Sequence, residues 1–132
     1  LIEDILNFNN KNLAGFVANS VIKVCNFIGL SCQFSFSSEF HSESFGWQAA
    51  ERIVSICKKE KCTEYLNLIG GRELYRKEFF SENSLRISFL ESGIIQYQQF
   101  KNRFIPSLSI IDVLMFNSKE QVVSMLDNYS LK

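Results

Sequence analysis

Three short polar stretches carry side chains that could bind or activate a substrate. The first places hydroxyl, carboxylate and imidazole groups close together, in Ser37, Ser38, Glu39 and His41. Such a set can hydrogen-bond a sugar or a phosphate, and the imidazole can assist proton transfer. Serine-rich loops also commonly form turns and cap helices, so a solvated loop is the alternative. His41 is a candidate catalytic residue, although alone it defines no catalytic pair.

The second stretch combines paired glycines with a guanidinium group, in Gly70, Gly71 and Arg72. Backbone amides beside a guanidinium suit an anion or a carboxylate, which makes these three residues candidate ligand-binding residues. The same glycines could instead supply left-handed backbone angles for a tight turn. Tyr75 follows closely, and its hydroxyl could bond to a ligand or to the backbone.

The third stretch runs from Gln96 to Asp112 and mixes aromatic, amide, hydroxyl and carboxylate groups. Asp112 is a second candidate catalytic residue, because a carboxylate facing a cleft could orient a substrate amine or hydroxyl. It also follows Ser107 and Ser109, either of which could cap a helix, and there it would favour the helix dipole. Both roles stay open at this point.

Standard catalytic signatures are absent from the chain. It contains no G-x-S-x-G nucleophile elbow, no P-loop, no G-x-G-x-x-G fingerprint and no H-E-x-x-H motif. These residues therefore leave the reaction open and identify no cofactor.

The four cysteines are Cys25, Cys32, Cys57 and Cys62. Their spacing matches neither a zinc site nor a disulfide-rich scaffold. With one histidine in the chain, a structural zinc site would need mostly thiolates from a helix interior and a strand. We therefore expect free thiols that pack as small apolar groups and bind no metal.

The elements that must position these groups follow from the hydrophobic pattern. Apolar residues recur at helical spacing over Leu13–Ile28, which Gly29 ends, and over Trp47–Lys59, whose apolar face includes Trp47. Alternating or largely apolar short runs indicate three strands, over Leu30–Phe36, Glu64–Ile69 and Leu85–Leu90. A brief helix near Leu74–Phe80 should lie between the last two.

Alternation of helices and strands predicts an α/β fold with a mainly parallel sheet of at least three strands flanked by helices. Ligands of such sheets bind beyond the carboxyl ends of the strands, in the loops after Phe36, Ile69 and Leu90. A long ordered loop should lead to Pro106, and a helical C-terminal segment should follow, with helices over Ile110–Phe116 and from Ser118 through Leu126.

Composition limits the classes of protein. At 132 residues, with 46% hydrophobic and 21% charged residues, the chain is predicted to form a single α/β domain over residues 1–132. Fourteen basic and fourteen acidic residues cancel, so charge argues against nucleic acid as a partner. No apolar run suits membrane insertion and no signal peptide is evident, so we expect a cytoplasmic protein. Because Leu1 is not methionine, an upstream part is expected to be missing.

Three stretches together resemble one protein family: ERIVSICKKEKCTEYLNLIGGRELY, SLRISFLES with YQQF, and FIPSLSIIDVLMFNS. They are similar to the WbqC-like proteins of bacteria, and the likeness covers most of the chain from Ser37 onward. Family members typically carry an upstream half with a strand and a loop containing histidine and proline, which nothing here matches. The resemblance therefore implies that the chain corresponds to the C-terminal part of the usual family chain.

The resemblance implies a pathway more firmly than a reaction. The family is linked to O-antigen and other surface-polysaccharide gene clusters, and transfer of an amino-acyl group such as glycine to a sugar has been proposed for it. Carried onto this chain, the family motifs mark five candidate cleft residues: Gly70, Gly71, Tyr75, Ser109 and Asp112.

Two functions from different classes follow. The first is a transferase that binds a nucleotide sugar or an acyl donor, completed by groups of the upstream half. The second is a non-catalytic binding or assembly module of the same pathway, whose apolar surface covers a partner. Loss of an upstream half would expose apolar area, and a homodimer is then expected. A cleft uniting the candidate residues would favour the enzyme, and a flat apolar patch on the first helix would favour assembly.

Overall fold

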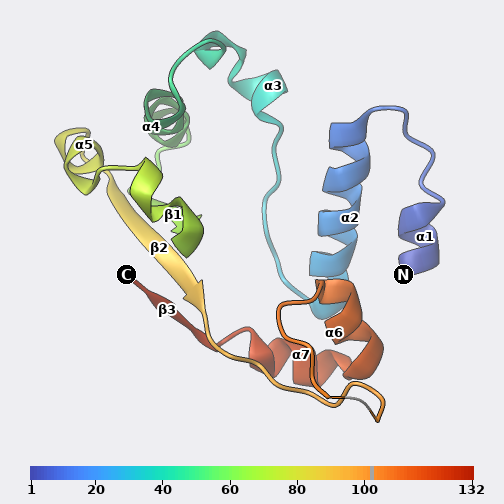
Figure 1. Cartoon of the computed structure of the whole chain (residues 1–132). Coiled ribbons are helices and arrows are strands. Elements are labelled where there is room, and N and C mark those ends of the chain that lie inside the picture. The colour runs from blue at the N-terminus through green and yellow to red at the C-terminus, as the bar shows by residue number, and fades with distance from the viewer. Residues whose placement is uncertain (102) are drawn as a thin grey trace. The chain divides into compact units, whose positions relative to one another are not determined.

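The computed structural model describes residues 1–101 and 103–132 of the chain (Figure 1). These residues form two compact units. Unit 1 comprises Leu1–Phe34 and Ile94–Asn128, and unit 2 comprises Ser35–Gly93 and Tyr129–Lys132. The expectation of a single α/β domain over residues 1–132 stays a prediction.

Unit 2 is built on a three-stranded mixed sheet in the order β1-β2-β3. β1 (Glu64–Leu68) pairs in parallel with β2 (Arg86–Ser92), so that Leu68 lies opposite Leu90. β3 (Tyr129–Leu131) pairs antiparallel with the carboxyl end of β2, so that Leu131 lies opposite Leu90. The α/β class is confirmed, as is the parallel pairing of the strands predicted over Glu64–Ile69 and Leu85–Leu90. The expectation of a mainly parallel sheet is not confirmed, because one of the two strand pairings is antiparallel.

The strand predicted over residues 30–36 is wrong. This segment has no regular structure and leads directly into the short helix α3 (Ser37–Phe40). Its alternating pattern creates no buried face, since Phe34 remains 45% exposed. In the described chain no strand pairs with its backbone, and alternation alone does not stabilise a strand. The loop at Ser37 therefore does not follow a strand end, contrary to expectation.

The core of unit 2 lies between the sheet and two helices, α4 (Ala49–Lys59) and α5 (Lys77–Glu82). Phe80 on α5 and Phe89 on β2 are both fully buried. Tyr65 on β1 stacks on Phe80, with ring centroids 5.9 Å apart. Each such aromatic side chain removes about 150–250 Å² from water, so this cluster is a major source of the unit's stability.

Short 3₁₀ helices complete unit 2. The segment η1 (Ser42–Ser44) precedes α4, and η2 (Ile69–Leu74) follows β1. The brief helix predicted near residues 74–80 is thus divided, with η2 ending where it should begin and α5 covering its second half.

Unit 1 is helical, with α1 (Ile2–Leu6), α2 (Leu13–Ile28), α6 (Ile110–Phe116) and α7 (Lys119–Met125). The prediction for α2 is confirmed to the residue. The predicted capping box of the last helix is confirmed too, because the Ser118 hydroxyl accepts from the Gln121 amide and the Gln121 side chain accepts from the Ser118 amide. In the described part of the chain, no helix has the length and apolar character needed to cross a membrane.

Three helices end in the same turn, in which a residue of positive φ follows the last helical turn. In α2 this residue is Gly29 (φ 84°), in α4 it is Lys61 (φ 56°) and in α5 it is Ser84 (φ 59°). Each turn has the two backbone hydrogen bonds of a Schellman motif; in α2 these run from Gly29 to Asn26 and from Leu30 to Cys25. The motif pairs carbonyls that the helix end would otherwise leave without partners.

We predict that Gly29→Ala lowers the free energy of unfolding by about 1 kcal/mol, because a Cβ atom is strained at positive φ. Lys61→Gly is the matched opposite change. It should raise the free energy of unfolding by about 0.5 kcal/mol, because glycine removes the strain that lysine bears at positive φ. The gain is smaller than the full strain because glycine also makes the unfolded chain more flexible. Urea unfolding of the purified variants measures both; equal signs would contradict the assignment of these caps.

Candidate functional site

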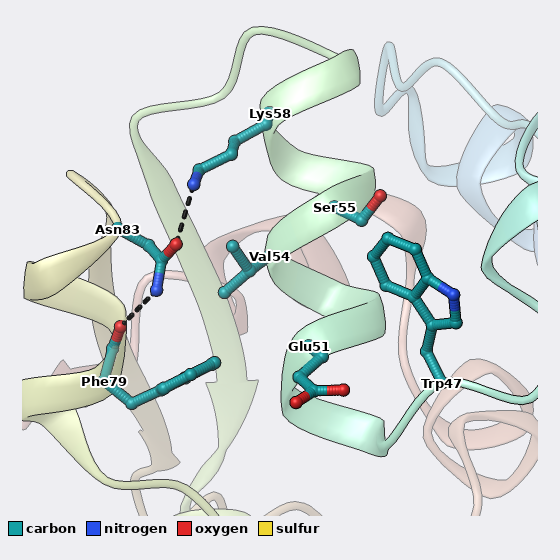
Figure 2. Close-up of a pocket in the computed structure, with 7 residues that line it drawn as sticks. All are labelled: Trp47, Glu51, Val54, Ser55, Lys58, Phe79 and Asn83. Carbon is teal, nitrogen blue, oxygen red and sulfur yellow. Dashed lines mark hydrogen bonds between the residues drawn. The ribbon is translucent and has the colours of Figure 1, made fainter.

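A pocket of about 550 Å³ lies in unit 2 along α4 and α5 (Figure 2). Glu51, Ser55 and Lys58 recur at three and four residue spacing on α4 and so share one side of the helix. The other lining residues are Trp47, just before α4, Val54 on the same helix, and Phe79 and Asn83 from α5 and its end. We call this pocket the α4–α5 groove.

The groove combines an aromatic surface with groups that donate and accept hydrogen bonds. Trp47 is 51% exposed, so much of its indole is open to solvent. The Lys58 ammonium donates to Asn83 Oδ1 at 2.7 Å, and Asn83 Nδ2 donates to the Phe79 carbonyl at 2.9 Å. Glu51 adds an exposed carboxylate. A few oriented polar groups on a largely apolar wall are typical of sites for small organic ligands.

A smaller pocket of about 190 Å³ shares Glu51 and Phe79 with the groove. It adds Gln48 and Arg76, and therefore a guanidinium, to the lining. A ligand with an anionic arm would find a cation at this end.

Sequence patterns missed the α4–α5 groove because Trp47 was assigned to the buried face of the helix. That assignment is wrong, since Trp47 precedes α4 and is half exposed. A usable signal was present in the polar residues Glu51, Ser55 and Lys58 at helical spacing beside the single tryptophan. It could not show that α5 would provide the second wall.

The imidazole of His41 is buried, with 2% of the residue exposed. Its Nε2 lies 2.9 Å from Glu60 Oε1, at the end of α4. The His41 carbonyl accepts from the Ser44 hydroxyl at 2.7 Å. His41 thus ties the loop before α4 to the end of that helix, and in this arrangement its ring is not open to a substrate.

Two cations on α4 bind the same loop. Arg52 donates to Ser44 Oγ at 3.2 Å and to Ser37 Oγ at 3.0 Å. Lys59 forms an ion pair with Glu43 at 2.8 Å, and this hydrogen bond lowers the pKa of Glu43. Ser37, a candidate ligand residue, is therefore engaged within the protein.

Two other residues of the loop complete its description. Lys59 also donates to the Phe40 carbonyl. Ser38 is exposed, and no hydrogen bond of its side chain is found among residues 1–101 and 103–132. We call residues 37–46 the α4 clasp.

Gly70, Gly71 and Arg72 lie in η2 after β1. Neither glycine has a positive φ, so the alternative of a left-handed turn is wrong. A Cβ at Gly71 would lie 2.5 Å from Asn67 Nδ2, so the Asn67 side chain would have to shift, whereas Gly70 faces open space. Arg72 is exposed, and the described chain offers it no hydrogen bond or ion pair, so the anion-binding role stays a prediction.

Tyr75 is part of the core cluster of unit 2 rather than of an open cleft. Its ring meets Tyr65 and Phe80 edge-on, with centroids 6.2 and 5.9 Å away. Burial raises the pKa of Tyr65, and the neighbouring Tyr75 raises it further. These contacts assign packing to Tyr75.

Asp112, in unit 1, accepts two hydrogen bonds through Oδ2. The donors are the Tyr97 hydroxyl at 2.6 Å and Gln99 Nε2 at 2.9 Å. Gln99 is 8% exposed and also holds Ile105, accepting from its amide at 2.8 Å and donating to its carbonyl at 3.1 Å. Asp112 therefore anchors the long loop before α6. Asn102, within the same stretch of sequence, lies outside the described residues.

Ser109 caps α6, since its hydroxyl accepts from the Ile111 amide at 3.2 Å. It also lines an apolar pocket of about 280 Å³ in unit 1, together with Ile5, Val21, Val24 and Cys25. The candidate residues are thus distributed over several places: the α4 clasp, η2, the core of unit 2 and the start of α6.

The cysteines differ in exposure more than expected. Cys57 is buried, Cys25 is intermediate, and Cys32 and Cys62 are exposed. The prediction that all four pack as buried apolar groups is therefore wrong for two of them. No group of three or more metal-ligating side chains is found within residues 1–101 and 103–132.

Comparison with known proteins gives one match. The family model of the WbqC-like protein family matches residues 1–124 of the chain. No curated protein and no solved structure matches the chain.

The contact between Tyr97 and Asp112 predicts an unusual titration. Its hydrogen bond to the Asp112 carboxylate raises the pKa of Tyr97 above the ordinary value of 10.0. Asp112→Asn should lower it, because the neighbouring negative charge is removed. Ultraviolet titration of the tyrosines measures the change, and Tyr97→Phe identifies the transition. Since the pKa is raised by folding, the stabilisation holds below pH 10 and is lost as the pH rises through the folded-state pKa.

The protein should contain no zinc when it is purified without added metal, because the cysteines and the single histidine do not form a tetrahedral site. Elemental analysis of the purified protein measures this. One zinc ion per chain would overturn the prediction.

Proposed function

The chain belongs to the WbqC-like protein family, and we propose that it binds the sugar substrate of a transferase in bacterial surface-polysaccharide (O-antigen) biosynthesis. The reaction proposed is transfer of an amino-acyl or acyl group, such as glycine, from a donor to a hydroxyl or amino group of the sugar. In this reaction the sugar atom forms the new bond to the acyl carbon, loses its proton and displaces the leaving group of the donor.

The observation that carries this proposal is the chemistry of the α4–α5 groove. A pyranose has an apolar face of C–H groups and a rim of hydroxyls. The exposed indole of Trp47 suits the face, because a flat aromatic ring offers a large apolar contact at low conformational cost. Glu51, Ser55 and Lys58 suit the rim, since together they offer accepting and donating groups.

The charges of the groove also suit a nucleotide sugar. Lys58 lines the groove and Arg76 lines the adjoining small pocket, so a cation is present at each. Phosphate oxygens are good partners for both side chains. A sugar ring on Trp47 and a diphosphate near one of these cations is the arrangement we propose.

Transfer needs groups beyond the groove. His41 and Asp112, the two candidate catalysts, are both hydrogen-bonded within the protein. We therefore assign sugar binding to this part of the chain and propose that a further segment or a partner supplies the groups that activate the acyl donor.

A non-catalytic assembly module is the second candidate, supported by the surface of unit 1. Leu13, Val17 and Val21 recur every four residues on α2 and are 77%, 50% and 47% exposed. An exposed apolar stripe of this kind favours contact with another protein surface. Under this alternative the chain self-associates, and binding of sugars is not its function.

We predict that Trp47→Ala weakens binding of a nucleotide sugar by at least about tenfold, which corresponds to about 1.4 kcal/mol, because the stacking surface is lost. Isothermal titration calorimetry against a panel of nucleotide sugars measures the affinity. In the unmodified protein, fluorescence of the single tryptophan should change on binding, since Trp47 is the only one in the chain.

Phe40→Ala is the matched control, because Phe40 is similarly exposed at 55% but does not line the groove. It should bind as the unmodified protein does. Equal affinities for all three proteins would contradict the sugar site. Absence of binding together with a dimer in sedimentation velocity that Val17→Asp dissociates would favour the assembly module.

A further inference from the structure

The turn that ends α4 brings two cysteines together. Cys57 lies in the last turn of the helix, and Cys62 is the second residue after its C-cap, Glu60. The Cys62 amide donates to the Cys57 carbonyl at 2.8 Å, and the Lys61 amide donates to the Lys58 carbonyl at 3.1 Å. With Lys61 at φ 56°, this is a complete Schellman motif.

Backbone geometry places the two Cα atoms within disulfide range. A 2.8 Å hydrogen bond between the two backbones, extended by ordinary bond lengths and angles, allows a Cα separation of at most about 6 Å. Disulfides usually span about 4.4–6.8 Å between Cα atoms. In a Schellman motif, moreover, the side chains at these two positions commonly touch each other.

The two thiols have different environments. Cys62 is exposed, and its thiol makes a weak contact of 3.9 Å with the Glu60 carbonyl. Cys57 is buried in the core cluster of unit 2. Burial raises the pKa of Cys57, and the negative charge of an ionised Cys62 raises it further.

We propose that Cys57 and Cys62 form a thiol pair that is oxidised to an intramolecular disulfide by a small-molecule disulfide. Cys62 is the attacking residue because it is accessible, and Cys57 is the resolving residue because it is adjacent and shielded. The thiols are reduced in the resting protein, so the pair is a modification site. This inference does not depend on the proposed sugar binding.

The steps balance as thiol–disulfide exchange. The Cys62 thiolate attacks one sulfur of the external disulfide, forming a mixed disulfide and releasing one small thiolate. The Cys57 thiolate then attacks Cys62 Sγ, which breaks the mixed disulfide and releases the second small thiolate. The two protons lost by the cysteines are taken up by the released thiolates. Two protein thiols are oxidised, and one external disulfide is reduced.

Oxidation would close a ring over residues 57–62, which contains Lys58 and Glu60. Lys58 lines the α4–α5 groove and bonds Asn83, and Glu60 holds His41 of the α4 clasp. A covalent ring here would lock the turn from which both contacts are made. The oxidation state of the pair is thus linked to the geometry of both features.

Glutathione disulfide serves as the probe, added in excess to the full chain at pH 8. Acid quenching, alkylation of remaining thiols and intact mass should show Cys57 and Cys62 protected by a mass loss of about 2 Da before alkylation, beside any glutathione added to the exposed Cys32. Trypsin cleaves after Lys58 and Lys61, so the disulfide should join the peptide of residues 53–58 to that of residues 62–72.

Variants separate the two roles. Cys57→Ser should stop at the mixed disulfide on Cys62, and Cys62→Ser should leave Cys57 alkylatable only after unfolding. Combined Cys25→Ser and Cys32→Ser is the matched control and should retain the linked peptides. Because Cys57 has a raised pKa, the mixed disulfide of the unmodified protein should disappear faster as the pH rises from about 7 to about 9.

The result in the unmodified protein decides the matter even if a variant fails to fold. Linked peptides 53–58 and 62–72 support the proposal. A mixed disulfide on Cys62 that persists at about pH 9 while Cys57 remains a thiol overturns it. Linkage of Cys62 to Cys25 or Cys32 overturns it as well.

Discussion

Parallel pairing of β1 with β2 obliges the chain to return the full length of a strand before the second strand can begin. Residues 69–85 make this return, and they contain η2 and α5. The return carries Phe80 onto the sheet, where it meets Phe89 and Tyr65 in the core. It also sets α5 along α4, and the α4–α5 groove is a consequence of this placement. The site and the core thus depend on the same crossover.

Helix ends place the strands of unit 2. Lys61 and Ser84 turn the chain out of α4 and α5 through left-handed angles, and β1 and β2 start two or three residues later. Such angles cost about 1–2 kcal/mol for a residue with a side chain. Burial of Leu85 directly after Ser84, at 4% exposed, offsets the cost in α5. After α4 the corresponding position is Cys62. The same backbone motif therefore buries a leucine after α5 and leaves a thiol exposed after α4.

Side chains that resemble catalysts in the sequence serve mainly to hold loops. The α4 clasp contains only the short helices α3 and η1, and the described residues of the loop before α6 form no helix or strand, so polar side chains satisfy backbone groups in both. Gln99 holds both backbone groups of Ile105, and Asp112 receives Gln99 and Tyr97. His41 and Glu60 have the corresponding role in unit 2. These hydrogen bonds hold the imidazole of His41 and the carboxylate of Asp112 in place within the protein. Glu51 and Lys58 are exposed and are therefore the groups more available to a ligand.

The sequence by itself determined helices α2, α6 and α7, most of α4 and two of the strands. Helical hydrogen bonds and caps are local, so periodicity, Gly29 and the pair Ser118–Gln121 were sufficient to locate α2 and α7. β1 and β2 were predicted from their short apolar runs. The run of β2 is buried at Ile87 and Phe89, whereas Leu66 and Leu68 of β1 are 48% and 67% exposed. Tertiary structure alone decided the rest. A strand needs a partner that is distant in sequence, so the alternating segment 30–36 remained irregular while the exposed segment Tyr129–Leu131 became β3 through its pairing with β2. Exposure likewise depends on neighbours, which is why Trp47 lies open in the groove although its spacing from α4 residues indicated burial.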